Sequence, residues 1–291
     1  MKKPVLIVAI LALAFGSVLG LTFVASAQEK AAPNAPELVR KALGNAGRSL
    51  DLLDKYSYTK HQVTESYDLK GKLLRRDEWT VAFTPCEGKT CTTLLSHNGA
   101  PPSAKELKEH DKEMRKAWEK QAKQTPEDKR KEEDDDVMLS QDFLEIFTFV
   151  LSGRESYKEQ PAYIIEFTPK AEKAELKAHE SKVLARMAGR LWISEKEEKV
   201  LAVEMHMIKP IKVWGGIAGA IDTMKVLSDY VVSEAGEYLP RRVDTEMDVR
   251  LGFTSKVRLK ISEEYTDFKL AVSAMQRGDA GQTRARLLLL L

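Results

Sequence analysis

In the segment "RRVDTEMDVRL", Arg241 to Leu251, charged and uncharged residues alternate strictly from Arg242 onward. Its uncharged members occupy the odd positions: Val243, Thr245, Met247, Val249 and Leu251. This period of two is typical of a β-strand with one dry face and one wet face. The segment from Phe253 to Ile261 repeats the pattern after Gly252, a typical turn residue. The sequence therefore predicts a hairpin whose apolar face must be covered, either by the protein's own helices or by a ligand.

The rest of the chain predicts an α+β protein in which helices interrupt an antiparallel meander. Apolar residues at helical spacing predict an amphipathic helix over residues 35–56. Alternating segments predict three strands between Tyr56 and Gly99, and five or six more between Gly189 and Phe268. The regular succession of strand and helix that a parallel sheet requires is missing from the sequence.

The middle of the chain is expected to be largely helical. Between Lys105 and Asp136, 22 of 32 residues are charged, with both signs mixed. This composition favours solvated helices at the rim over a polyelectrolyte tail, with a second helix beginning near Thr125. From Phe143 to Val150, apolar residues recur at i, i+3, i+4 and i+7, which predicts a buried helix. Two short strands with a turn at residues 160–161 and a charged helix over residues 171–187 are expected next.

Residues 1–27 have the features of an export signal. A short positive region precedes the almost entirely apolar segment from Val5 to Val24, and a small-x-small cleavage motif ends at Ala27. We therefore expect cleavage after Ala27 and a periplasmic mature protein that starts at Gln28. Because about 20 apolar residues can also span a bilayer, an uncleaved N-terminal membrane anchor is the alternative.

The charge balance argues against nucleic acid as a partner. Without the two lysines of the export segment, 44 basic residues face 44 acidic ones. A chain so close to neutrality has no overall positive field that would attract a phosphate backbone. We therefore expect no nucleic-acid binding.

Cys86 and Cys91 are the two cysteines of the chain. Their spacing between two β-like segments is typical of a hairpin end closed by a disulfide, which an exported protein can keep oxidised. A metal site is one alternative, but no second cysteine pair or nearby histidine pair completes four ligands. A redox pair is the other alternative, although such sites usually have two residues between the cysteines. A structural disulfide and no metal site are expected.

Motifs that would identify an enzyme are missing from the sequence. It contains no nucleophile elbow, no glycine-rich phosphate loop and no zinc-protease motif. The five histidines are scattered, and His206 lies on the polar phase of its strand, where it should face solvent. Glu155 and Glu166 are the types of residue that act as paired acids, but nothing in the sequence brings them together. The glycine-rich segment after Trp214 fits either a gate or a wide hairpin anchored by the tryptophan.

Several motifs occur in a familiar order. They are the export segment, "YSY" at Tyr56, "SHNGAPP" at Ser96, "GRESYKEQPAYIIEFTP" at Gly153, "GRLWIS" at Gly189, and "YLPRRV" at Tyr238. In this order the chain resembles the outer-membrane lipoprotein-sorting superfamily, the LolA/LolB/RseB-like periplasmic carriers. The resemblance implies an open antiparallel half-barrel of about 8–11 strands with helices over its concave face. It implies a linker at residues 28–35, the half-barrel at 36–270 with a charged helical insertion at 103–136, and a C-terminal tail at 271–291.

The resemblance also implies that the concave face holds acyl chains of a lipid or lipoprotein, with no cofactor. Methionine suits such a lining because its side chain adapts to a variable partner. The expected lining residues are Met205, Met207, Trp214, Val243, Met247, Val249, Phe253 and Leu259, with Leu201 and Val203 on the same strand face as Met205. Envelope proteins and a transient membrane contact are further partners that it implies. The alternative is a structural or protein-interaction module whose core is filled and whose charged helices form the contact surface.

Overall fold

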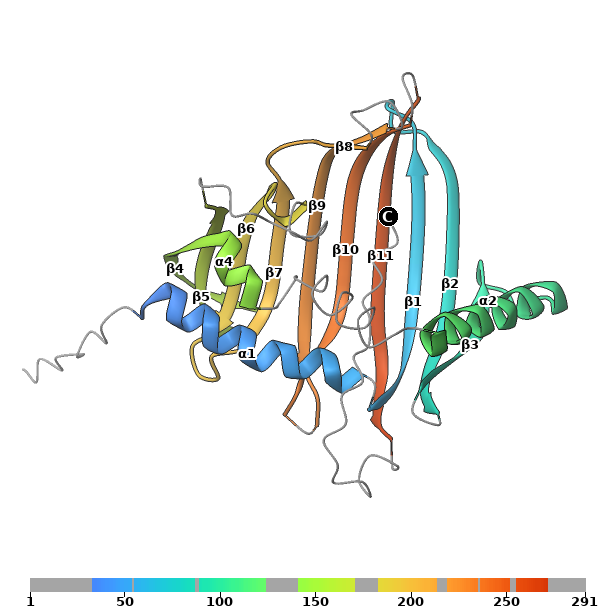
Figure 1. Cartoon of the computed structure of the whole chain (residues 1–291), viewed down its shortest axis with the longest axis horizontal. Coiled ribbons are helices and arrows are strands. Elements are labelled where there is room, and N and C mark those ends of the chain that lie inside the picture. The colour runs from blue at the N-terminus through green and yellow to red at the C-terminus, as the bar shows by residue number, and fades with distance from the viewer. Residues whose placement is uncertain are drawn as a thin grey trace, which may run out of the picture. The chain divides into compact units, whose positions relative to one another are not determined.

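The computed structural model describes residues 33–53, 55–86, 89–123, 141–170, 183–213, 219–234, 236–251 and 255–271. In these ranges one 11-stranded sheet dominates the structure (Figure 1). The helices packed with it are α1 (Ala35–Leu53), α2 (Ala104–Lys123) and α4 (Gln141–Ile146). The strands are β1 (Tyr56–Tyr67), β2 (Leu73–Cys86), β3 (Lys89–His97), β4 (Phe147–Tyr157), β5 (Gln160–Pro169), β6 (Met187–Ser194), β7 (Val200–Met207), β8 (Ile211–Val213), β9 (Gly219–Val232), β10 (Tyr238–Leu251) and β11 (Ser255–Leu270).

The strands follow the order β3-β2-β1-β11-β10-β9-β7-β6-β5-β4, and β8 pairs with β9 beside this path. Every one of these pairings is antiparallel. The strands β1 and β11 lie side by side in the interior of the sheet, although they are distant in sequence (Figure 1). The edges, β3 and β4, do not pair with each other, so the sheet stays open. The predicted α+β fold, an open antiparallel half-barrel with helices, is confirmed.

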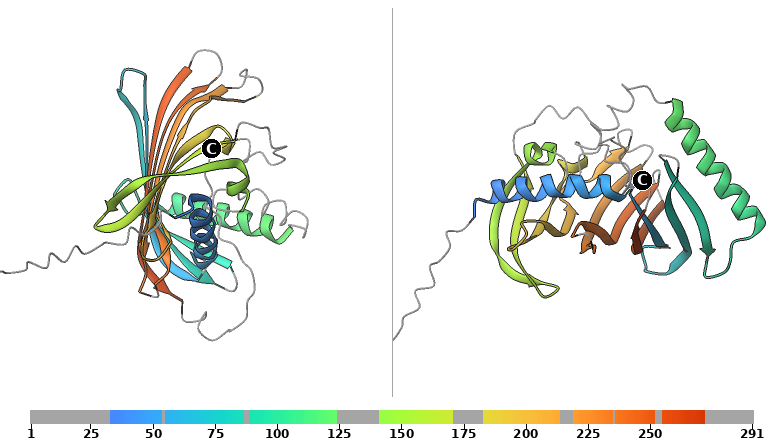
Figure 2. Two further views of the ribbon diagram at one scale, coloured as in Figure 1. Left: turned by 90° about the vertical axis from the view of Figure 1, so that its left-hand side faces the viewer. Right: turned by 90° about the horizontal axis from the view of Figure 1, so that it is seen from below.

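Helix α1 crosses one face of the sheet (Figure 2) and contacts β4, β7, β10 and β1. Its first turn is capped by Asn34, whose Oδ1 accepts a hydrogen bond from the backbone N–H of Glu37 at 3.1 Å. The apolar side of its first half is buried in the main core: Ala35, Leu38, Val39, Ala42 and Leu43. The spacing of these residues is what the sequence pattern predicted for an amphipathic helix.

The alternation of residues 241–251 has the predicted structural consequence. On β10, Val243 and Met247 are buried in the main core, whereas Glu246 is exposed on the opposite face. The wet face carries ion pairs between neighbouring strands, such as Arg258 Nε with Asp248 Oδ1 at 2.8 Å. One face of the sheet is therefore apolar and the other is covered by paired charges.

The helix predicted from Phe143 to Val150 is wrong in its second half. Helix α4 ends at Ile146, and β4 begins at Phe147. Within β4, Phe147 and Phe149 are buried while Val150 is 62% exposed, which is a period of two. The apolar residues of 143–150 fit both the helical period of 3.6 and the strand period of two. Pairing with β5 favours the strand from Phe147 onward, because it provides hydrogen bonds for the backbone groups of both segments.

The expected turn at residues 160–161 is also wrong by two positions. Lys158 and Glu159 form the turn, with φ angles of 48° and 69°, and Gln160 already pairs with Tyr157. Two successive positive φ angles are typical of a type I′ hairpin turn, which matches the twist of the flanking strands. Met187 begins strand β6 and does not end a helix. Residues 183–184 are helical, as expected, and residues 185–186 form a turn before β6. Residues 171–182 of that expected helix lie outside the described residues.

Leu201 does not share a face with the core residues of its strand, contrary to expectation. The β6–β7 register shifts between Trp192 and Ile193. Because a shift of one residue reverses the direction of every side chain beyond it, Leu201 packs in a separate cluster with Trp192 and Tyr238. Val203 and Met205 remain in the main core, as predicted.

Several expectations fall outside the described residues. They concern the export segment 1–27, the helix start near Thr125, Trp214, Phe253 and residues 272–291. Among the helices that are described, none is long and apolar enough to span a bilayer.

Candidate functional site

Six of the eight expected lining residues lie together on the face covered by α1. Met205, Val243 and Met247 are buried in the main core, and Met207, Val249 and Leu259 are half-buried against it. The register places Met247 opposite both Met224 and Leu259. Met247 is only 2% exposed. The structure thus gathers these residues in one methionine-rich layer, and their contact with an acyl chain stays a prediction.

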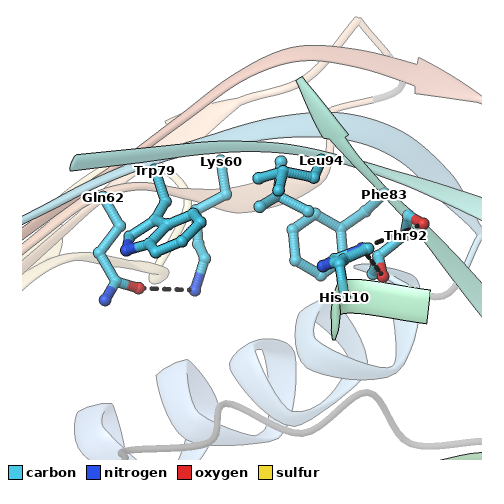
Figure 3. Close-up of a pocket in the computed structure, with 8 residues that line it drawn as sticks. Lys60, Gln62, Trp79, Phe83, Thr92, Leu94 and His110 are labelled. Atoms are coloured by element: carbon cyan, nitrogen blue, oxygen red, sulfur yellow. Dashed lines mark hydrogen bonds between the residues drawn. The ribbon is translucent and has the colours of Figure 1, made fainter. Parts of the chain in front are cut away.

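A cavity lies on the same face of the sheet, toward the edge formed by β3. Its volume is about 270 Å³. It is lined by Lys60, Gln62, Trp79, Val81, Phe83, Thr92, Leu94 and His110 (Figure 3). The first seven belong to β1, β2 and β3, and the last belongs to α2. The register confirms the shared face, because Lys60 stands opposite Tyr265 on one side and Val81 on the other, and Tyr265 belongs to the main core.

The walls of the cavity are mainly apolar and aromatic. Alternate residues of β2 supply Trp79, Val81 and Phe83, and β3 supplies Leu94. The ring of Phe83 stacks on Tyr58 with centroids 4.7 Å apart. Because the ring of Phe83 already packs on one side, this part of the cavity wall is held in place without a ligand.

One ion pair interrupts the apolar lining. Lys60 Nζ lies 3.0 Å from Glu263 Oε1 and donates a hydrogen bond to Gln62 Oε1 at 3.2 Å. The hydroxyl of Tyr265 donates to the other oxygen of Glu263 at 3.0 Å, and burial raises the pKa of Tyr265. The charge of the lysine is therefore already balanced by a carboxylate, so this wall offers polar atoms without a net charge.

Helix α2 covers the β3 side of the cavity. His110 Nε2 lies 3.0 Å from Thr92 Oγ1, and Trp118 Nε1 donates to the carbonyl oxygen of Thr90 at 3.4 Å. The helix begins with a capping box: Ser103 Oγ accepts from the N–H of Glu106, and Glu106 Oε2 accepts from the N–H of Ser103 at 2.7 Å. The capping box thus fixes where helix α2 begins, beside the cavity.

His97 joins this helix start to the sheet. Its Nδ1 is hydrogen-bonded to Glu106 of α2, and its Nε2 lies 3.1 Å from Asp77 Oδ1 of β2. Its ring stacks on Trp79, with centroids 3.6 Å apart. The hydrogen bonds to Asp77 and Glu106 raise the pKa of His97.

The pKa values of the two carboxylates that contact His97, Asp77 and Glu106, are lowered. Hydrogen bonds from Ser103 and then from His97 lower the pKa of Glu106 to about 2. Burial raises the pKa of Asp77, but the hydrogen bonds and charges of His97 and Arg75 outweigh this effect and leave that pKa below its ordinary value. Each group of this cluster therefore favours its charged form.

The structure does not bring the two candidate acids together. Glu155 stands opposite Ala162 and accepts a hydrogen bond from Trp192, whereas Glu166 stands opposite Val150.

Cys86 and Cys91 form the predicted disulfide, with Cα atoms 5.8 Å apart. The described residues contain no group of three or more His, Cys, Asp or Glu that could hold a metal ion.

The cavity residues were not predicted from the sequence. The alternation of Trp79, Val81 and Phe83 was a usable signal, because it marks one apolar face of β2. The signal did not show that a helix covering this face would leave space. His97 and His110 were noted as scattered histidines, and only the β2–β3 hairpin and α2 place both of them beside the cavity.

No family model and no curated protein sequence matches the chain. Among solved structures, it is similar to a LolA superfamily protein from Nitrosomonas europaea, with 13% identity over 82% of this chain and 94% of that chain and a TM-score of 0.30. A putative outer membrane lipoprotein-sorting protein domain from Vibrio parahaemolyticus shares 12% identity over 80% of this chain and 94% of that chain, with a TM-score of 0.35. The Pseudomonas aeruginosa MucA/MucB complex gives 9% identity over 78% and 94%, with a TM-score of 0.25.

Proposed function

We propose that the protein is a periplasmic carrier or sensor that binds an acyl chain of a lipid or lipoprotein on the covered face of its sheet. The observation that carries this proposal is the apolar cavity between β1, β2, β3 and α2. Its volume of about 270 Å³ lies just below the range of about 300–1,000 Å³ that is common for small-molecule sites. A cavity of this size would hold one segment of an acyl chain.

The chemistry of the surrounding face supports an extended apolar ligand. The cavity has no unbalanced charge, because Lys60 is paired with Glu263. Beyond Tyr265 the same face continues into the methionine-rich layer around Met247. Methionine side chains repack at low cost, so this layer is suited to admit more of the chain when the ligand binds.

A membrane contact fits the hairpin that joins β1 and β2. Leu69 is 65% exposed and Leu74 is 55% exposed at this hairpin, beside Lys70 and Lys72. Exposed leucines flanked by lysines are suited to a transient contact with an anionic lipid surface. Such a contact would give the carrier or sensor access to its lipid, and envelope proteins are further candidate partners.

A structural or protein-interaction module with a filled core is the second candidate. The deep burial of Met205, Val243 and Met247 favours it, because residues packed this closely leave little space for a ligand. On this alternative the charged helix α2 would provide the contact surface, and the cavity would be a packing defect.

Binding of an acyl probe distinguishes the two candidates. Lipid extraction and native mass spectrometry of the purified protein should show a co-purified lipid, and a fluorescent fatty acid should bind saturably. Val81→Phe fills the cavity and should weaken binding of the probe by at least about tenfold. Val150→Phe makes the same change on the exposed face of β4 and should leave the affinity unchanged. No lipid and no saturable probe binding would leave the filled module as the function.

A further inference from the structure

The two ring nitrogens of His97 face two carboxylates on different elements. Nδ1 is hydrogen-bonded to Glu106 in the first turn of α2, and Nε2 lies 3.1 Å from Asp77 of β2. A neutral imidazole has one N–H and can donate only one hydrogen bond, whereas the imidazolium donates two. Both bonds therefore require the protonated ring.

The neighbours of His97 define what happens when the ring loses its proton. Arg75 Nη2 donates to Asp77 at 2.7 Å, so this carboxylate keeps a partner without the histidine. Asn98 Nδ2 lies 3.1 Å from His97 Nε2, and its Oδ1 accepts from the N–H of Glu78. A neutral His97 can accept from this amide and still donate to Glu106. The deprotonated arrangement thus loses the bond to Asp77 and the charge that attracts Glu106.

The other hydrogen bonds identified between the described side chains of α2 and strand β3 do not join opposite charges. His110 meets the hydroxyl of Thr92, Trp118 meets a backbone carbonyl, and Thr92 Oγ1 lies 3.6 Å from Met114 Sδ. Among the described residues, the charged attachment of α2 to the sheet is concentrated at its start, where His97 meets Glu106. That start leads directly to His110, which lines the cavity.

We propose that His97 is a protonation-dependent clamp that holds the first turn of α2 against the sheet and thereby slows exchange of the ligand in the cavity. The second half of this statement rests on the proposed function, whereas the clamp itself does not. The groups that face His97 are Asp77, with Arg75 behind it, Glu106 and the uncharged Asn98. With both carboxylates ionised, the clamp is closed while the ring is charged and loosens when the ring becomes neutral.

The direction of the pH effect follows from these groups. The raised pKa of His97 keeps the clamp closed at and below about pH 6.5 and loosens it as the pH rises through that raised value. The lowered pKa values of Asp77 and Glu106 keep the carboxylates ionised down to acidic pH. The clamp is therefore expected to open on the alkaline side.

The test combines a titration of His97 by NMR with amide hydrogen exchange of residues 106–110, corrected for the intrinsic pH dependence; the amides of residues 106 and 107 are hydrogen-bonded to Ser103. In the wild-type protein, protection of these amides should fall by about tenfold as His97 titrates. Glu106→Gln keeps the capping box, because glutamine also fills that position, but removes the charge. It should lower the pKa of His97 and give weak protection across the pH range. His61→Gln is the matched control, because His61 pairs with Glu78 on the opposite face at 2.9 Å.

Protection that does not follow the titration of His97, or that is unchanged in Glu106→Gln, would overturn the clamp. The ligand step is tested with the fluorescent fatty acid, whose dissociation rate should rise by about tenfold over the same pH range in the wild type. If the probe binds but its dissociation rate does not change as His97 titrates, the proposal that His97 controls ligand exchange is overturned. Absence of any probe binding would instead reject the proposed function, and NMR and exchange would still decide whether the clamp exists.

Discussion

The disulfide between Cys86 and Cys91 acts on a short segment. The two cysteines are 5 positions apart, between β2 and β3. A bond across so short a loop removes little entropy from the unfolded chain, so it should contribute only about 2 kcal/mol. Replacing both cysteines by serine should lower the free energy of unfolding in urea by that amount. Thiol labelling of the denatured, unreduced wild type should find no free cysteine, and two labelled thiols would contradict the bond.

A substitution at Met247 tests how far the proposed acyl site extends. Its strand alternates without error, and its side chain lies beside Met224 and Leu259 in the methionine-rich layer. If the ligand reaches this layer, Met247→Trp should weaken binding of the fluorescent fatty acid and leave the free energy of unfolding nearly unchanged. A tightly packed layer would instead lose about 1 to 3 kcal/mol. The urea midpoint and the probe affinity, measured on the same variant, separate these results.

At the scale of the elements, strands β6 and β7 approach each other so closely that one position requires glycine. A Cβ atom at Gly189 would overlap the carbonyl oxygen of Glu204 and lie 2.8 Å from Phe167 Cζ. Gly189→Ala should therefore cost about 1 to 3 kcal/mol or more, seen as a lower urea midpoint. Gly153→Ala is the matched control, since its Cβ would meet nothing nearer than Ile164 Cδ1 at 3.9 Å. Equal stability of the two variants would contradict this packing.

The β1–β2 hairpin is the element expected to touch a lipid surface. Leu69→Ser combined with Leu74→Ser removes the two most exposed leucines there. Co-sedimentation with vesicles that contain anionic lipid should fall several-fold, because both apolar contact and its orientation by the neighbouring lysines are lost. Leu95→Ser, at a 46% exposed leucine of β3, is the control. Binding that is insensitive to the hairpin variant but lost in the control would place the contact elsewhere.

The sequence predicted those elements in which one periodicity dominates. Strand β10 and helix α1 follow a single pattern, and both were predicted correctly. Residues 143–150 carry two patterns, so only pairing with β5 could decide between helix and strand. The cavity could not be predicted because its walls come from three strands and a helix. Local spacing shows which face of each strand is apolar, but it does not show how completely another element fills that face.

At the scale of the whole molecule, the order of the strands connects the cavity to the core. Strands β1, β2 and β3 carry most of the cavity wall, and β11 and β10 connect it to the methionine-rich layer around Met247. Tyr265 of β11 contacts Glu263 beside the cavity and belongs to the main core. Binding of a ligand in the cavity should therefore also affect the packing of the neighbouring core. Any ligand that binds only the folded chain will raise the free energy of unfolding.

The pH dependence of unfolding should show an optimum set by the charged cluster that joins α2 to the sheet. Because hydrogen bonds raise the pKa of His97 in the folded protein, its contribution is complete below about pH 6.5 and is lost as the pH rises through the raised value. The pKa values of Glu106 and Asp77 are lowered, so their contributions are complete above about pH 4.5 and are lost as the pH falls. Urea unfolding across this range should thus give a maximum between the two limits. In His97→Gln the alkaline decline should be smaller than in the wild type and in His61→Gln, and an unchanged decline would show that other groups cause it.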